Sequence, residues 1–286
     1  MAVTGAAGGI GSVVARRFAD AGFAVVASDY GVTLEGDGAD PGPAERVAGD
    51  IVAAGGRAVP HFGDVSRPEV AEELVATAVD TYGRLDALVT CHGIFREGSV
   101  LDISPDDWAA VVGNHLTGTF TCVQHAARQM CRQRSGSIVC VTSSSGMEGN
   151  PLTAHYAAAK AGVVALVKST ALAVGRYDVN ANGIIPNAVT RVTTRPSSVS
   201  AQWWKGDAPT PDLGATLAVA LTRPEARRIT GQVFTATGHR LARWSQPVEE
   251  RAEARDDWTV DAVLDSLSGT LAGPPLTRFG YPNESQ

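Results

Sequence analysis

The sequence is short of several residue types, and each shortage excludes a class of protein. Only four cysteines occur among 286 residues, at positions 91, 122, 131 and 140, and no two of them form a Cys-x-x-Cys pair. We therefore expect free, buried thiols in a reducing cytoplasm and no metal site. Basic residues are also outnumbered, with 24 lysines and arginines against 30 acidic residues and a net charge of −6. A nucleic-acid groove needs a basic stripe, so no nucleic-acid partner is expected.

Long apolar runs are missing as well. No apolar run reaches the length that spans a bilayer, and Met1 leads directly into the first strand without a signal peptide. We therefore expect a cytoplasmic protein without membrane contact. The first strand has almost no room before the turn that follows it, which indicates either a start codon placed too late or a very short strand.

What the sequence does contain is a regular alternation of strands and helices. Buried strands are predicted at 24–28, 58–61, 87–90, 137–142, 179–185 and 231–237, and helices at 43–54, 68–82, 104–133, 153–174 and 213–221. Such alternation is typical of an α/β fold with one doubly wound parallel sheet covered by helices on both faces. Residues 1–240 form this domain. Residues 241–286 hold too little apolar area for a core of their own and are predicted to be a C-terminal extension.

A glycine-rich turn separates the first strand from the first helix. It reads Thr-Gly-Ala-Ala-Gly-Gly-Ile-Gly over residues 4–11. Glycines allow a backbone to approach a pyrophosphate, and the N-terminus of the following helix supplies N–H donors. Because the turn lies between a strand and a helix, a dinucleotide site is favoured over a plain turn. We assign Gly5, Gly9, Ile10 and Gly11 to that site.

Asp29 ends the second strand, about twenty residues after the glycine turn. A carboxylate at this place can bind the adenosine ribose hydroxyls and would repel a 2′-phosphate. No lysine or arginine lies in the glycine turn or just after Asp29, so NAD is predicted rather than NADP. The other interpretation of Asp29 is a turn former at a strand end. The Gly-, Asp- and Pro-rich segment 30–43 is predicted to be a surface loop beside the adenine end.

Several other residues lie where ligands bind in such sheets, beyond the carboxyl ends of strands. Asp64 and Val65 follow the third strand, His92 and Gly93 follow the fourth, and Ser143 follows the fifth. Asn114 lies inside the long helix predicted at 104–133, where asparagine is mildly unfavourable. A helix irregularity near Gly113 and Gly118 would explain it without a function.

Tyr156 and Lys160 lie four residues apart in the helix predicted at 153–174. Residues at this spacing share one face of a helix. A nearby ammonium lowers the pKa of a phenol from its reference of about 10, and such a tyrosine can transfer a proton near neutral pH. The pair occurs in many helices by chance, so its weight comes from the motifs around it.

Together and in this order, the motifs resemble those of the short-chain dehydrogenase/reductase family. The matching positions, within about residues 2–238, are Thr4-Gly5-x-x-x-Gly9-x-Gly11, Asp29, Asp64-Val65, Asn114, Ser143 and Tyr156-x-x-x-Lys160. The resemblance implies a Rossmann-type fold, NAD as cofactor, and hydride transfer between that cofactor and a secondary alcohol or ketone. It also implies roles for four residues. Tyr156 is the general acid/base, Ser143 holds the substrate oxygen, Lys160 lowers the tyrosine pKa and binds the nicotinamide ribose, and Asn114 holds a water in a proton relay.

Two stretches depart from the family pattern. Many members carry Asn-Asn-Ala-Gly after the fourth strand, where this chain has Thr-Cys-His-Gly at 90–93. His92 either points away from the cofactor or alters its pose and adds a polar contact. Many members also carry Pro-Gly after the sixth strand, where this chain has Pro186-Asn187. The segments 30–40 and 186–191 resemble the (3R)-hydroxyacyl-CoA dehydrogenase part of the multifunctional β-oxidation enzymes, and we assign Val189 to the cofactor site.

The substrate pocket is expected between the loops after the fourth and sixth strands. Its predicted residues are Ile94, Phe95, Pro186, Val189 and the segment 191–211 with Trp203 and Trp204. Most are apolar, which suits a hydrophobic alcohol or ketone such as a 3-hydroxyacyl thioester. Arg191 and Arg195 either meet an anionic group of the substrate or are surface charges.

Other functions and the assembly remain open from sequence. The same fold with retained NAD could serve an epimerase or dehydratase, and a catalytically silent NAD-binding regulator is a further alternative. The complete set of Asn114, Ser143, Tyr156 and Lys160 favours the oxidoreductase. Members of this family pair through two long helices, at about 106–133 and 153–174 in this sequence, so a homodimer or homotetramer is expected. The extension covers either a neighbouring subunit or the pocket.

Overall fold

The computed structural model describes residues 1–186, 188, 209–255 and 258–273. By compactness the chain divides into two units, Met1–Arg243 and Trp244–Gln286. The first unit contains the sheet and all the predicted site residues that are described. Among its described residues, the second contains one helix.

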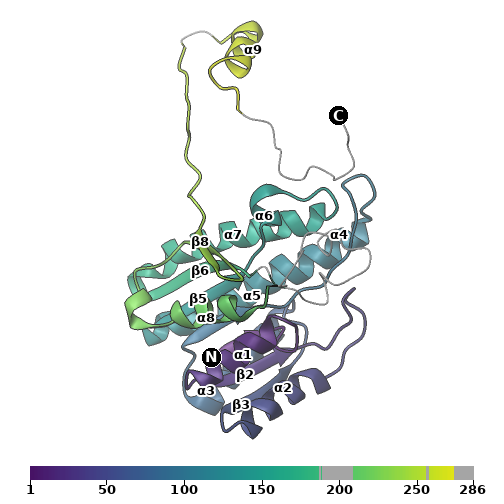
Figure 1. Ribbon diagram of the computed structural model, residues 1–286, viewed down its shortest axis with the longest axis vertical. Coiled ribbons are helices and arrows are strands. Elements are labelled where there is room, and N and C mark those ends of the chain that lie inside the picture. The colour runs from purple at the N-terminus through teal and green to yellow at the C-terminus, as the bar shows by residue number, and fades with distance from the viewer. Residues whose placement is uncertain (187, 189–208, 256–257, 274–286) are drawn as a thin grey trace. The chain divides into compact units, whose positions relative to one another are not determined.

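Within the described residues, eight strands form a single sheet (Figure 1). Their order is β3-β2-β1-β4-β5-β6-β7-β8, and every pairing from β3 to β7 is parallel. The strands are β1 (Ala2–Thr4), β2 (Ala24–Asp29), β3 (Arg57–Phe62), β4 (Ala87–Thr90), β5 (Gly136–Val141), β6 (Val179–Ile185), β7 (Val233–Thr237) and β8 (Arg240–Arg243). The order reverses direction between β1 and β4, which is where ligands bind in open α/β sheets. The predicted doubly wound parallel sheet is confirmed.

β8 is the strand that the sequence does not predict. It pairs antiparallel with β7, with Thr237 opposite Arg240 and Phe234 opposite Arg243. Its side chains are mostly exposed, because it is an edge strand, and polar edge strands lack the apolar run that marks a buried strand. The first compact unit therefore ends at Arg243, three residues beyond the predicted boundary.

Helices cover both faces of the sheet (Figure 1). Apolar side chains of α1 (Gly11–Asp20), α2 (Gly42–Ala53) and α8 (Asp212–Ala220) join one core cluster. Those of α3 (Pro68–Tyr82), α5 (Gly118–Gln133) and α7 (Ala154–Val174) join the other. Successive strand residues alternate between the two clusters, as the pleat requires. In β2, Val25 and Ala27 belong to the first cluster and Val26 to the second.

The described part of the first unit also contains several shorter helices. They are α4 (Pro105–Val112), a π-helix (Gly113–Thr117), α6 (Ser145–Glu148) and two 3₁₀ turns (Gly175–Tyr177 and Pro224–Ala226). The start of α4 follows from its sequence. Ser104 Oγ accepts a hydrogen bond from Asp107 N at 3.0 Å, and Pro105 occupies the first helical position.

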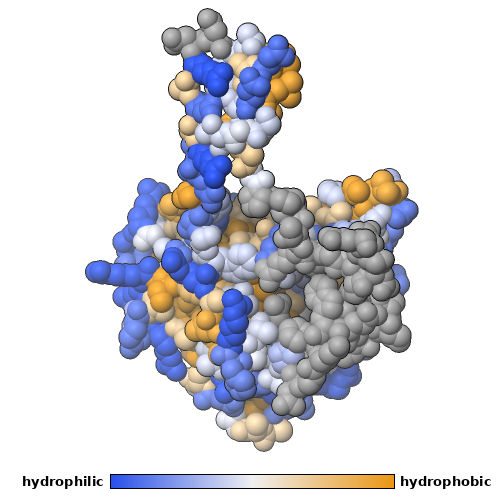
Figure 2. Space-filling view, turned by 45° about the horizontal axis from the view of Figure 1, so that its top comes forward, coloured by the Kyte–Doolittle hydropathy of each residue, from blue (hydrophilic) through white to orange (hydrophobic). Residues whose placement is uncertain are grey.

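The helix α7 corrects one expectation about membranes. With the turn that follows, Ala154–Tyr177 is 24 residues long and apolar enough to cross a bilayer by length and composition alone, so the prediction that no run reaches this length is wrong. Half of its apolar window is buried inside the protein, because α7 packs on the sheet as a core helix. Figure 2 shows hydrophilic residues over most of the described surface in that view, with apolar residues in smaller groups.

The second unit is held by contacts within itself. Thr259 caps α9 (Val260–Ser268) by accepting a hydrogen bond from Ala262 N at 3.1 Å. Arg251 Nη1 donates to the carbonyls of Thr270 and Ala272, which follow the helix. Several apolar side chains of α9 are exposed, among them Val260, Leu264 and Leu267.

Candidate active site

The glycine turn leaves no room for side chains. Gly5 has φ +64°, and a Cβ there would lie 2.6 Å from the Cα of His92. A Cβ on Gly11 would lie 2.0 Å from the carbonyl oxygen of Gly5. The turn is therefore packed backbone against backbone where α1 begins, and this brings the helix N-terminus to the carboxyl edge of the sheet.

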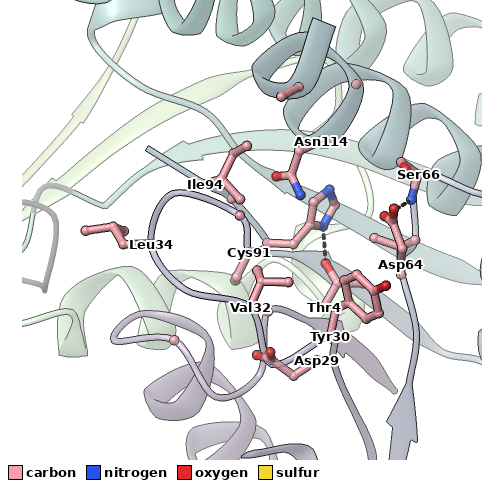
Figure 3. A pocket seen from close by; sticks show the side chains of 18 of the residues that line it. Thr4, Asp29, Tyr30, Val32, Leu34, Asp64, Ser66, Cys91, Ile94 and Asn114 are labelled. Atoms are coloured by element: carbon pink, nitrogen blue, oxygen red, sulfur yellow. Dashed lines mark hydrogen bonds between the residues drawn. The ribbon is translucent and has the colours of Figure 1, made fainter. Parts of the chain in front are cut away.

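A cavity of about 330 Å³ opens beside this turn (Figure 3). Of the predicted site residues, Gly5, Asp29, Asp64, Val65, His92, Gly93 and Asn114 line it. Gly9, Ile10 and Gly11 lie in the turn but are not among the lining residues, and neither are Ser143, Tyr156 and Lys160. Val189, Arg191, Arg195, Trp203 and Trp204 lie outside the described residues. The cavity thus joins the ends of β1, β2, β3 and β4.

The carboxylate of Asp29 is fixed at the edge of this cavity. Its Oδ2 accepts a hydrogen bond from Ala7 N in the glycine turn, and its Oδ1 accepts one from Gly31 N, both at 2.8 Å. Asp64 is fixed in a similar way, since its Oδ1 accepts from Ser66 N at 2.9 Å. The carboxylate oxygens still have lone pairs for ligand hydroxyls.

The segment after β2 forms a wall of the cavity, where the sequence predicts only a surface loop. Its residues Tyr30, Val32, Thr33, Leu34 and Gly36 line the cavity. The Leu34 carbonyl accepts a hydrogen bond from Phe95 N at 2.7 Å, and the Glu35 carbonyl accepts one from Arg96 Nε at 3.0 Å. The loop is thereby fastened to the segment after β4, about sixty residues further along the chain.

Arg96 is the one arginine or lysine among the residues that line the cavity. Its Nη1 lies 2.7 Å from Asp107 Oδ1 in α4, and its Nε is bonded to the Glu35 carbonyl. The guanidinium is therefore engaged by a carboxylate and a backbone carbonyl.

Ser143, Tyr156 and Lys160 come together beyond the end of β5. Ser143 precedes α6, and its Oγ accepts from Ser145 N at 3.2 Å. The Ser143 hydroxyl lies near enough to the Tyr156 phenol to influence its pKa. The Lys160 Nζ lies 5.7 Å from the centre of the Tyr156 ring. The i, i+4 spacing thus places the tyrosine and lysine on one face of α7.

Burial is the largest influence on the pKa values of Tyr156 and Lys160. It raises the pKa of Tyr156 above the ordinary value of 10, and the nearby Ser143 hydroxyl acts in the opposite direction. It also lowers the pKa of Lys160 to about 8. The expectation that Lys160 lowers the tyrosine pKa is not met. The Lys160 ammonium instead donates to the carbonyl of Val141 at 2.9 Å, and desolvation of the phenol outweighs the remaining contacts.

Asn114 lies in the π-helix Gly113–Thr117, between α4 and α5. The helix irregularity expected near this point is present. Extra-wide turns of this kind occur frequently at functional sites. Asn114 lines the cavity, and its Oδ1 is buried without a hydrogen-bond partner. An unpaired buried acceptor is costly, so a water or ligand donor at this atom would be stabilising.

His92 is also among the residues that line the cavity. Its Nδ1 lies 2.6 Å from Thr4 Oγ1 in the glycine turn. Its Nε2 is buried and has no hydrogen-bond partner. Burial, followed by the charge of Lys160, lowers the pKa of His92 to about 4. The ring is therefore neutral near neutral pH.

Sequence reasoning missed His115 and the closeness of Phe95 to the catalytic group. The rings of both residues pack against the ring of Tyr156. The position of His115 directly after Asn114 is the only signal for it in the sequence, and that signal required the π-helix to be known. Among the described residues, no cluster of histidine, cysteine or acidic side chains could hold a metal ion.

The arrangement fits a nicotinamide dinucleotide. A glycine-rich turn meets a helix N-terminus, as a pyrophosphate requires. Asp29 presents a carboxylate at the cavity edge, and Asn114 offers a buried acceptor without a partner.

Comparison with known proteins identifies similar chains. The family model described as short chain dehydrogenase matches residues 1–202. The hydroxyacyl-CoA dehydrogenase ChsB1 of Mycobacterium tuberculosis is 34% identical over 283 residues, covering 95% of this chain and 88% of that one. The crystal structure of a short chain dehydrogenase from Mycobacterium avium superposes with a TM-score of 0.82 at 31% identity and covers 96% of each chain.

A multidomain relative matches over a shorter stretch. The peroxisomal multifunctional enzyme type 2 of Mus musculus is 38% identical over 191 residues, which is 67% of this chain and 26% of that enzyme. The chain thus matches only about a quarter of the mouse enzyme, and the similarity concerns that part alone.

Proposed function

This chain belongs to the short-chain dehydrogenase/reductase family, and from that premise we propose that it is an NAD-dependent enzyme that interconverts a hydrophobic secondary alcohol and the corresponding ketone. The family relation establishes an oxidoreductase of CH–OH groups that uses a nicotinamide cofactor. The preference for NAD, the roles of single residues and the substrate class are the proposed parts. The observation that carries the proposal is the proximity of Ser143 to the Tyr156 phenol, with the buried ammonium of Lys160 beside the tyrosine ring.

Asp29 supports NAD over NADP. Its carboxylate is held at the cavity edge by two backbone N–H groups, where it can accept hydrogen bonds from ribose hydroxyls and would repel a phosphate. Arg96, the one lysine or arginine lining the cavity, is paired with Asp107. Gly5, Gly9, Ile10 and Gly11 would bind the pyrophosphate. Asp64, Val65, His92 and Gly93 would line the rest of the cofactor site, with Val189 as a further expected contact.

NAD, when bound, supplies the hydride acceptor for alcohol oxidation and the hydride donor in the reverse direction. The proton is handled by the protein. In oxidation, Tyr156 would first pass its own proton toward solvent, and its phenolate oxygen would then take the proton from the substrate alcohol as the C–H bond breaks. The Ser143 hydroxyl would hold the same oxygen by a hydrogen bond. Acid–base assistance of this kind contributes roughly 10²–10⁴-fold to the rate.

Lys160 would bind ribose hydroxyls of the cofactor. Its pKa of about 8 lets it exchange protons close to neutral pH. Asn114, whose Oδ1 has no partner within the described residues, would hold a water that carries the proton onward. These four residues form the proposed catalytic set.

A 3-hydroxyacyl thioester is the substrate class with the most support. A relative named as a hydroxyacyl-CoA dehydrogenase matches nearly the whole chain. The ring of Phe95 lies 6.4 Å from that of Tyr156 and offers an apolar wall beside the reacting group. A hydrophobic chain next to the carbinol carbon would contact such a wall favourably. We further propose a cytoplasmic homodimer or homotetramer without nucleic-acid or membrane partners.

The test is NADH formation from NAD⁺ across a substrate panel, with NADP⁺ assayed in parallel. The panel contains (3R)- and (3S)-hydroxyacyl-CoA esters of several lengths, hydroxysteroids and simple secondary alcohols. Turnover of the (3R)-thioesters with NAD⁺ preferred at least tenfold is the expected result. Turnover of steroids or free alcohols alone would contradict the substrate class. Tight NAD binding without turnover of any compound would contradict the oxidoreductase reaction itself.

A further inference from the structure

His115 makes a specific contact with the ring of Tyr156. The two ring centres lie 4.9 Å apart, and the ring planes are inclined at 85°. This edge-to-face arrangement is the one that aromatic rings favour, because the positive edge of one meets the negative face of the other. Phe95 packs on the same tyrosine at 6.4 Å and 71°. The phenol ring is therefore held by two other rings.

The His115 ring is itself anchored by a hydrogen bond. Its Nε2 lies 2.7 Å from the carbonyl oxygen of Ile94. A carbonyl can only accept, so Nε2 carries the hydrogen and Nδ1 is unprotonated in the neutral ring. Nδ1 is buried and has no partner within the described residues. Burial and then the charge of Lys160 hold the pKa of His115 well below its ordinary value, so the ring remains neutral.

The surroundings leave space for this ring and for little else. Gly93 lies directly against it, since a Cβ at that position would come 2.4 Å from His115 Cε1. The backbone is secured as well, because Thr119 Oγ1 donates to the His115 carbonyl at 2.7 Å. The side chain is 3% exposed, so the ring cannot turn without displacing its neighbours.

The hydrogen bond between His115 and the Ile94 carbonyl joins two parts of the site. Ile94 lines the cavity assigned to the cofactor, and its carbonyl holds His115, whose ring packs on Tyr156. A single side chain thus connects the cavity wall after β4 with the helix that carries the tyrosine. A displacement of a reacting group by 1 Å can reduce a rate about a hundredfold, so such a connection has value for catalysis.

We propose that His115 is a positioning residue, which fixes the ring of Tyr156 against the cofactor cavity by an edge-to-face contact anchored on the Ile94 carbonyl. The inference rests on the proposed role of Tyr156 as the proton-transfer group. His115 does not itself exchange a proton in the reaction.

Two substitutions separate the ring from its anchor. His115→Phe keeps an aromatic ring but removes the N–H donor, and His115→Gln keeps an N–H donor but removes the ring. We expect His115→Gln to lower kcat about ten- to a hundredfold while the Kd of NAD changes less than twofold. His115→Phe should retain kcat within about threefold, although its thermal stability falls because the Ile94 carbonyl loses its partner. His125→Gln, in the partly buried part of α5, is the matched control and should leave kcat unchanged.

A second readout does not depend on turnover. Tyrosine labelled with ¹³C at Cζ reports the phenol pKa by NMR, and Tyr156→Phe identifies the signal. His115→Gln admits water beside the phenol, so the pKa of Tyr156 should fall by about half a unit or more, and His115→Phe should leave it nearly unchanged. If His115→Gln keeps full kcat and the wild-type pKa of Tyr156, the positioning role is wrong. If wild-type protein turns over no alcohol, the proposed function fails, and the NMR comparison still decides whether His115 fixes the ring.

Discussion

Buried histidines are a notable feature of this protein at the residue scale. His61, His92, His115 and His155 all have pKa values below the ordinary 6.5, and burial is the largest cause in each case. In the unfolded chain these rings take up protons as the pH falls through 6.5, whereas the folded protein resists protonation until a lower pH. The unfolded state therefore binds more protons in this window, and the stability of the fold decreases as the pH falls from 6.5 toward 4.

His92 allows this effect to be measured. Its pKa of about 4 and a cost of about 1.4 kcal/mol for each unit of pKa difference predict a loss of roughly 2–3 kcal/mol between pH 7 and pH 4. Urea unfolding of wild type and His92→Ala at both pH values checks this. Between pH 7 and pH 4, the free energy of unfolding of the variant should fall by roughly 2–3 kcal/mol less than that of the wild type. His125→Ala serves as control and should follow the wild type. If the free energy of unfolding falls equally in wild type and His92→Ala, His92 does not contribute to the pH dependence of stability.

Sequence reasoning succeeds for residues whose role depends on spacing along the chain. Tyr156 and Lys160 lie one helical turn apart, and Ser143 follows a strand that ends at the same edge of the sheet, so their proximity could be predicted. The partner of the Lys160 ammonium could not be, because the Val141 carbonyl is supplied by a strand end whose orientation depends on tertiary packing. His115 was missed for the same reason, since its contact with Tyr156 requires the π-helix and the space left by Gly93.

At the scale of elements, the loop after β2 bears on the affinity for the cofactor. It is fastened to the segment after β4 by the Leu34 and Glu35 carbonyls, and Gly36 faces Ile94. A loop held in this way forms a cavity wall without a strand or helix of its own. Its docking should therefore contribute to the affinity for the dinucleotide.

Two glycines of this loop offer a matched comparison. Gly36 has φ +101°, and a Cβ there would lie 3.2 Å from side-chain atoms of Ile94, whereas Gly38 has φ +85° and nothing within 4 Å. Both alanine variants carry backbone strain, but only Gly36→Ala also crowds the docking contact. Gly36→Ala should raise the Kd of NAD about three- to tenfold in calorimetry, and Gly38→Ala less than twofold. Equal effects of the two variants would mean that the contact with Ile94 is irrelevant to binding.

Elements with strong local signals were predicted closely. The bounds of α3 at Pro68 and Tyr82 match the structure, because proline begins the helix and Gly83, with φ +81°, ends it. The edge strand β8 and the four-residue helix α6 (Ser145–Glu148) have no such signals. They are short and mostly stabilised by pairing or packing with distant segments, so they could not be read from periodicity.

At the scale of the whole molecule, exposed aromatic and aliphatic side chains bear on assembly. Trp108 on α4, Phe120 on α5 and Leu172 on α7 are exposed, with 46%, 45% and 88% of their surfaces accessible. These are the helices through which relatives were expected to pair. Large apolar side chains on such helices are typical of interfaces, and this supports the proposed homodimer or homotetramer.

A pair of charge substitutions tests the assembly. Phe120→Glu combined with Leu172→Glu should convert the oligomer into monomers in size-exclusion chromatography with light scattering, because buried unpaired carboxylates at an interface are costly. Val52→Glu, on α2 and 53% exposed, is the control and should leave the assembly intact. A wild-type protein that is monomeric at micromolar concentration would contradict the proposal.

The overall fold could be predicted because alternating strands and helices admit few arrangements other than a doubly wound parallel sheet. The antiparallel edge was beyond reach, since β8 is a short, polar edge strand, whereas the helix irregularity at Asn114 was expected from Gly113 and Gly118. The charge state of the site was also beyond reach, because it depends on burial. Thus the proximity of the proposed reacting groups could be predicted from sequence, while their pKa values required the structure.

The most direct test of the account is NADH formation by wild type and Tyr156→Phe, measured at 340 nm with NAD⁺ and a (3R)-hydroxyacyl-CoA ester. We predict turnover by the wild type and a loss of kcat of about 10²–10⁴-fold in Tyr156→Phe, with a much smaller change in the Kd of NAD, since Tyr156 is only one of several proposed cofactor contacts. A Tyr156→Phe variant that forms NADH as fast as the wild type would contradict the assignment of Tyr156 as the proton-transfer group.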